Sequence, residues 1–66
     1  MNTIGETILK RRMELGIKQQ ELADLAGVGI NTLVAIERGK GNPSIKTLMS
    51  ITDVLGLKLK LELSGN

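Results

Sequence analysis

Glycines divide this chain into four short segments with helical periodicity, and their spacing constrains the fold more than any other feature. Gly16, Gly27 and Gly56 each follow a run in which apolar residues recur every three or four positions, and the loop Gly39–Pro43 ends a further run. Glycine commonly follows a helix, because it adopts the left-handed conformation there at little cost. We therefore expect four helices, over about residues 4–15, 19–26, 30–38 and 45–55.

The 66 residues include no cysteine, no histidine and no aromatic side chain. This composition removes disulfides, the usual zinc ligands and the commonest general base, so we expect neither an enzyme nor a bound metal or cofactor. The lack of aromatic residues weakens the case for single-stranded nucleic acid, whose bases generally stack on such rings. No apolar run approaches the roughly 18 residues of a membrane span. We expect no membrane partner and a location in the cytoplasm.

The sequence GLKLKLEL, residues 56–63, alternates leucine with charge, which is typical of a strand with one buried face. A lone strand leaves its backbone donors and acceptors unpaired. We expect the same segment of a second copy to supply the pairing, which divides the chain into a domain at 1–56 and a dimerising tail at 57–66. Alternatively, the tail folds back on its own domain or frays as a free end.

The segment 45–55 is apolar on more than one face, which is more apolar surface than one small core needs. We expect the leucine face of a ribbon formed by two tails to cover the surplus. The residues of this expected dimer surface are Ile51, Val54, Leu57, Leu59, Leu61 and Leu63.

Two charged residues fall on apolar stripes. Arg12 lies on the stripe that includes Ile8, and Glu37 follows Leu33 by four residues. A charge in such a position is tolerated mainly when it is paired and hydrogen-bonded. We predict that Arg12 and Glu37 form a structural ion pair that ties the first helix to the third. Five other basic residues are expected to form a solvated surface and not a binding patch: Lys10, Arg11, Lys46, Lys58 and Lys60.

The segments 19–26 and 30–38 are joined by a turn of three residues, with Ala23 small enough for close packing and Gly27 at the corner, which is the spacing of a helix-turn-helix. Together with IKQQELADLAGV, IERG and NPS in this order, the chain resembles the Cro and repressor-type (XRE-like) transcriptional regulators over roughly residues 4–55. The resemblance implies an all-α, four-helix, lambda-repressor-like domain with the C-terminal β-strand as an addition. It implies a sequence-specific regulator of double-stranded DNA, a homodimeric repressor that reads an inverted repeat in the major groove with helix 30–38.

The resemblance agrees with the helical wheel, on which Asn31, Val34, Ala35 and Arg38 turn away from the apolar stripe of the third helix. Asn31 is suited to a bidentate bond with adenine, whereas apolar side chains contact thymine methyl groups. The expected base contacts are Ile30, Asn31, Val34 and Ala35. Ile30 lies only about 60 degrees from the inward Leu33, so it can instead pack into the core.

Other positions are assigned to the DNA backbone by the same resemblance. The expected backbone contacts are Lys18, Gln19, Gly29, Thr32, Arg38, Lys40 and Asn42. Gln19 is expected to bond a phosphate and to brace the first residues of the third helix, although Gln19 and Gln20 are also ordinary solvated helix starters. Gly29 stands where this family often has a serine or threonine, and it brings no hydroxyl to the DNA. We therefore expect modest sequence specificity supplemented by DNA shape.

Two other functions fit the sequence. The tail also resembles that of the HipB-like antitoxins, which bind a toxin protein and repress their own operon as dimers. A protein-interaction module that has kept the fold without binding DNA is the other alternative. Salt-sensitive binding to duplex DNA separates the first interpretation from the last, because phosphate contacts release counterions.

Overall fold

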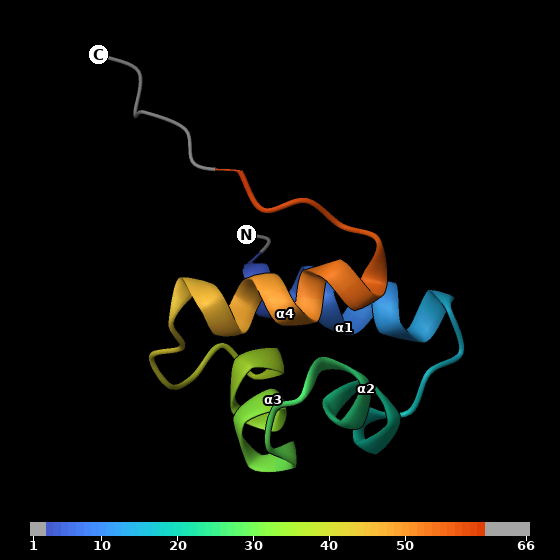
Figure 1. Ribbon diagram of the computed structural model, residues 1–66, viewed down its shortest axis with the longest axis horizontal. Coiled ribbons are helices and arrows are strands. Elements are labelled where there is room, and N and C mark those ends of the chain that lie inside the picture. The colour runs from blue at the N-terminus through green and yellow to red at the C-terminus, as the bar shows by residue number, and fades with distance from the viewer. Residues whose placement is uncertain (1–2, 61–66) are drawn as a thin grey trace.

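The computed structural model describes residues 3–60 and contains four helices within that range. They are α1 (Ile4–Glu14), α2 (Gln19–Ala26), α3 (Ile30–Glu37) and α4 (Ile45–Leu55). The four helices predicted from the sequence are confirmed, with α1 and α3 one residue shorter than expected. Figure 1 shows α1 and α4 together in one layer, and α2 and α3 on one side of it. Within the described part, none of the helices has the length and apolarity needed to cross a membrane.

Short polar residues and glycines set the helix ends. The Thr3 hydroxyl accepts the N–H of Glu6 at 3.1 Å, and the Ser44 hydroxyl accepts the N–H of Thr47 at 3.1 Å. These bonds satisfy amide groups that the first turn of a helix leaves unpaired. At the C-terminal ends of α2 and α4, Gly27 and Gly56 adopt the left-handed conformation.

Each helix contributes to one core between the two layers. Its largest fully buried side chains are Ile8, Leu22, Leu33, Ile51 and Leu55. The expected place of Ile51 in a dimer surface is therefore wrong, because its side chain is fully buried by its own domain and has no surface left for a second chain. Val54 is only half-buried.

Small residues allow the helices to approach closely. Ala23 is fully buried in α2, as its size predicted. In α1, a Cβ atom on Gly5 would overlap the carbonyl oxygen of Ile36 in α3. Because that obstacle is backbone, a side chain at this position requires α1 and α3 to move apart. Gly5 is therefore what permits the contact between α1 and α3.

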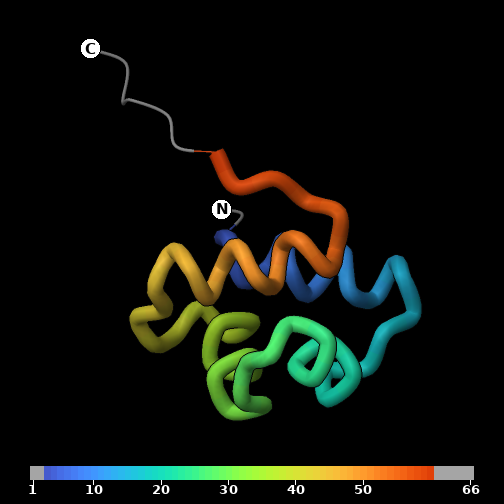
Figure 2. The backbone as a smooth tube through the Cα atoms, in the orientation of Figure 1, coloured from blue at the N-terminus to red at the C-terminus, as the bar shows by residue number. Residues whose placement is uncertain are grey.

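The described part of the tail lies along its own domain. Residues 57–60 follow the end of α4 and pass on the side of the α1–α4 layer opposite to α2 and α3 (Figure 2). Leu57 and Leu59 are half-buried against the core, while Lys58 and Lys60 are exposed. Packed leucines thus alternate with exposed lysines, as the sequence pattern predicted. Residues 57–60 fold back on their own domain, which was one alternative to pairing with a second copy.

Strand pairing itself is not present in the described residues of this single chain, 3–60. Leu61 and Leu63 of the expected dimer surface lie outside those residues. The intermolecular ribbon stays a prediction.

Candidate nucleic-acid interface

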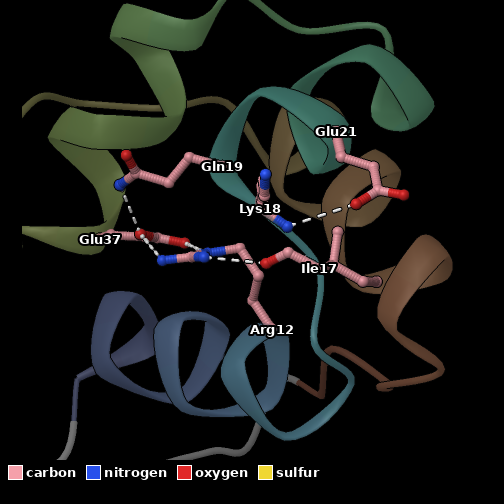
Figure 3. A network of polar contacts seen from close by, with 6 residues as sticks. All are labelled: Arg12, Ile17, Lys18, Gln19, Glu21 and Glu37. Atoms are coloured by element: carbon pink, nitrogen blue, oxygen red, sulfur yellow. Dashed lines mark hydrogen bonds and ion pairs between the residues drawn. The ribbon is translucent and has the colours of Figure 1, made fainter.

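A buried polar network fixes α3 to α1 and α2. Arg12 donates from Nε to Oε2 of Glu37 at 2.7 Å and from Nη2 to Oε1 at 3.1 Å. Its Nη1 donates to the carbonyl oxygen of Ile17 at 2.9 Å, and Nε2 of Gln19 donates to Oε1 of Glu37 at 2.9 Å. Figure 3 shows Arg12 extending from α1 toward Glu37, with Gln19 approaching from α2. The structure thus brings together the two residues expected to pair and adds Gln19 to them.

The network is nearly closed to water. The side chain of Glu37 is 3% exposed and that of Arg12 is 12% exposed. Glu37 accepts three hydrogen bonds, so the cost of removing its charge from water is offset by bonds in good geometry. Because Glu37 is the last residue of α3, the network holds the end of that helix in place.

The two glutamines that open α2 differ. Gln19 is half-buried and braces the last residue of α3, so the expected brace on the first residues of that helix is corrected. Gln20 is exposed and bonds Asp24 on its own helix at 2.9 Å, as an ordinary helix starter does. The N–H of Lys18 meets the carboxylate of Glu21 at 3.4 Å at the start of the same helix (Figure 3).

The outward face of α3 is open to solvent. Asn31, Thr32 and Arg38 are exposed, and Val34 and Ala35 are half-buried. All of these except Thr32 are positions that the helical wheel turned away from the core. Along the helix, polar side chains therefore lie at both ends of this face, and the smaller apolar side chains of Val34 and Ala35 lie between them.

Ile30 packs inward, which is one of the two alternatives that the helical wheel allowed for it. Its side chain is half-buried and packs against the core. Little of it remains for an expected base contact. Gly29 caps α3 through its extended backbone, with no side-chain bond.

A shallow hollow of about 350 Å³ lies between α3 and the loop that leads to α4. It is lined by Asn31, Thr32, Ala35, Ile36, Lys40, Gly41, Asn42 and Pro43. The structure thus places three of the expected DNA contacts from α3 beside two from the loop. Lys18 and Gln19, at the start of α2, are not part of this hollow. Within residues 3–60 no group of acidic side chains is arranged to hold a metal ion.

Two residues that position these elements were not predicted from the sequence. One is Gly5, although a glycine inside a helical pattern is itself a signal of close approach. The other is Arg11, which was expected on a solvated surface but is partly buried and donates from Nε to the carbonyl oxygen of Leu55 at the end of α4 at 3.0 Å. Arg11 lies off the apolar stripe, so the periodicity gave no signal for it.

Comparison with known proteins identifies the family. The sequence matches the helix-turn-helix family HTH_3 over residues 8–61. It is 34% identical over 61 residues to YonR, an SPbeta prophage-derived uncharacterized HTH-type transcriptional regulator of Bacillus subtilis, covering 92% of this chain and 56% of that protein. It is 32% identical over 62 residues to the uncharacterized HTH-type transcriptional regulator y4mF of Sinorhizobium fredii, covering 94% of this chain and 82% of that protein.

The fold has a close counterpart among solved structures. The crystal structure of SinR, a master regulator for biofilm formation, in complex with DNA superposes with a TM-score of 0.77. The two are 40% identical, and the match covers 85% of this chain and 90% of that chain. This chain spans little more than half the length of YonR but most of y4mF. On both sequence and structure, the chain belongs to the helix-turn-helix family HTH_3 of transcriptional regulators.

Proposed function

We propose that this chain binds double-stranded DNA through α3 and represses transcription by occupying an operator. The observation that carries the proposal is the outward face of α3, where Asn31 and Thr32 are exposed, as is Arg38 directly after the helix. The C-terminal end of the same helix is held in place by the buried Arg12–Glu37 pair. A rigid helix with one free polar face fits the major groove of B-form DNA. SinR, whose structure is a complex with DNA, supports the same assignment.

The side chains divide between bases and phosphates. Asn31 reads adenine by a bidentate bond, and Val34 and Ala35 offer apolar contact to thymine methyl groups. Phosphates are bound by Lys18, Gln19, Gly29, Thr32, Arg38, Lys40 and Asn42. A glutamine amide carries two N–H groups, so Gln19 can hold Glu37 with one and a phosphate with the other.

Dimerisation through the tail is the second part of the proposal. Two tails pair as antiparallel strands and place two α3 helices about 34 Å apart, one DNA turn, on an inverted repeat. Residues 57–60 lie on the side of the domain away from α3, so pairing there leaves the DNA-binding face free (Figure 1). Ile51 takes no part in this surface, because it is buried in the core.

DNA binding is tested by selecting bound sequences from random duplex DNA with the full chain and then measuring affinity for the selected sequence. The double variant Asn31→Ala/Arg38→Ala is expected to lose at least about tenfold in affinity, because a bidentate base contact contributes roughly 1–3 kcal/mol. Removing the phosphate contact of Arg38 also lowers the slope of log affinity against log salt by about one.

Lys10→Ala is the matched control for Arg38, since it removes one exposed positive charge from α1, where Lys10 lines a hollow with Leu57 and not the hollow beside α3. It is expected to keep wild-type affinity, and all variants are expected to keep the helical circular dichroism spectrum. A folded wild-type chain that selects no duplex sequence would instead support the protein-interaction module.

The dimer is tested by sedimentation of the full chain and of a chain truncated after Gly56. We expect a dimer and a monomer respectively. A truncated chain that still dimerises shows that the tail is not the dimer element.

The alternating leucines of the tail also keep the HipB-like antitoxin as a second candidate function. It predicts a neighbouring gene that encodes a kinase-like toxin and a stable complex of the two proteins. DNA binding is common to both functions, so the complex is the observation that separates them.

A further inference from the structure

The end of α4 connects the domain to the tail, and we call residues 55–57 the hinge. Gly56 is left-handed, with φ of +71°. Its N–H donates to the carbonyl of Asp53 at 3.2 Å, and the N–H of Leu57 donates to the carbonyl of Thr52 at 2.9 Å. These two bonds are the Schellman pattern that commonly closes a helix. They leave the carbonyl of Leu55, the first residue of the hinge, to be satisfied by another group.

Arg11 of α1 supplies that group. Its Nε donates to the Leu55 carbonyl oxygen at 3.0 Å in a partly buried contact. Its Nη2 lies 3.8 Å from the position that a Cβ atom on Gly56 would occupy, so the guanidinium lies against the hinge itself. A cation at the C-terminal end of a helix is also favoured by the helix dipole. Arg11 thus holds the residue from which the tail departs.

The next residue along α1 holds the helix proposed to read DNA. Arg12 bonds Glu37 at the end of α3, and Arg11 bonds Leu55 at the end of α4. Because neighbouring residues of one helix make both contacts, α1 is the common reference for the orientation of α3 and for the direction of the tail. In a dimer joined by its tails, that direction sets where the second α3 lies.

We propose that Arg11 is a positioning residue that determines which spacing between two half-sites the dimer binds. This inference rests on the proposed DNA binding and on dimerisation through the tail. Moving one half-site by one base pair rotates it by about a tenth of a turn and shifts it by roughly 3.4 Å. A fixed departure angle therefore discriminates between spacings, whereas a loose one tolerates several.

The test uses the full chain and duplexes that carry two copies of the selected half-site, separated by the preferred spacing or by one or two base pairs more or fewer. Wild type is expected to prefer one spacing by about tenfold or more, which corresponds to about 1.4 kcal/mol. Arg11→Met keeps most of the apolar length but removes the donor. It is expected to reduce that preference to about threefold or less, with affinity for a duplex carrying one half-site unchanged within about twofold.

Two further variants separate positioning from charge. Arg11→Lys retains a donor and is expected to restore most of the spacing preference. Lys10→Met removes the neighbouring exposed charge and is expected to leave the preference unchanged. If Arg11→Met does not fold, Gly56→Ala tests the same hinge, because an alanine is strained at this φ. It too is expected to flatten the preference.

The outcomes are distinct. If wild type has a sharp optimum and Arg11→Met keeps it, the role of Arg11 is overturned while the proposed function stands. The same conclusion follows if Lys10→Met flattens the preference as much as Arg11→Met does. A wild-type chain that binds one half-site as tightly as two contradicts the dimeric function itself, and the inference with it.

Discussion

Arg11 and Arg12 are neighbours on α1, yet they hold different parts of the molecule in different ways. Arg12 makes three hydrogen bonds to Glu37 and Ile17 and is nearly buried. Arg11 makes one hydrogen bond, to the carbonyl of Leu55, and its side chain is 38% exposed. Its second contact, an ion pair with Glu14 at 3.7 Å, lies at the surface and adds little.

The difference separates a rigid contact from an adjustable one. Losing one member of a buried ion pair leaves a charge without a partner, so this contact between α1 and α3 requires both residues. The Leu55 carbonyl can be satisfied by water when Arg11 moves, because the site is only partly buried. The contact that orients α3 is thus the stronger of the two, and the contact that directs the tail is the weaker.

The largest expected effect comes from breaking the rigid contact. Arg12→Met leaves the Glu37 carboxylate buried without its main partner, and we expect the free energy of unfolding to fall by about 3–5 kcal/mol. Chemical denaturation monitored by circular dichroism measures this loss. This loss is a large fraction of the total stability of a 66-residue domain, since stability is roughly 0.05–0.15 kcal/mol per residue.

The double variant Arg12→Met/Glu37→Met is the control for that interpretation. Replacing both charges by apolar groups of similar volume removes the unpaired carboxylate, so it is expected to be more stable than Arg12→Met alone. If the double variant is instead less stable than wild type by the sum of the two single losses, the cost arises from packing and not from the stranded charge.

A smaller effect is expected at the close approach of the same two helices. Gly5→Ala places a methyl group against the Ile36 carbonyl and forces α1 away from α3, which we expect to cost about 1–3 kcal/mol in the free energy of unfolding. Thermal unfolding checks this value. Because the displacement also stretches the bonds between Arg12 and Glu37, combining Gly5→Ala with Arg12→Met is expected to cost less than the sum.

Gly29→Ala is the matched control. A Cβ atom at Gly29 would come no nearer than 3.9 Å to the Thr32 hydroxyl, and its φ of −70° suits any residue. Its cost is limited to about 0.5–1 kcal/mol from a poorer helix cap. Equal losses for Gly5→Ala and Gly29→Ala would show that the close approach does not matter.

Much of the fold follows from local signals in the sequence. Gly27 and Gly56 marked two helix ends correctly, because capping is decided by residues close in the chain. Burial was harder to predict. Leu25 shares a face with Leu22 on the wheel but is 61% exposed, since the width of a buried face depends on which helix packs against it.

The candidate interface shows the same division. A charge on an apolar stripe needs a partner, so Arg12 and Glu37 were readable as a pair. The role of Gln19 in bracing Glu37 was not, because it depends on how α2 is placed against α3. Ile51 shows the same limit for apolar residues. Its position on an apolar face of the helix did not reveal whether it packs in the core of its own domain or against a second chain.

The smallest of these effects is expected at the adjustable contact. Arg11→Met should lower the free energy of unfolding by about 1 kcal/mol, the usual net value of one hydrogen bond, with Lys10→Met near zero as its control. Since Arg11 and Arg12 share no bonding partner, their losses should add within about 0.5 kcal/mol in the variant that combines them. Additive losses mean that the direction of the tail can change without disturbing the orientation of α3. A coupling larger than that would mean that α1 moves as a whole when either arginine is lost, and then the two contacts form one unit.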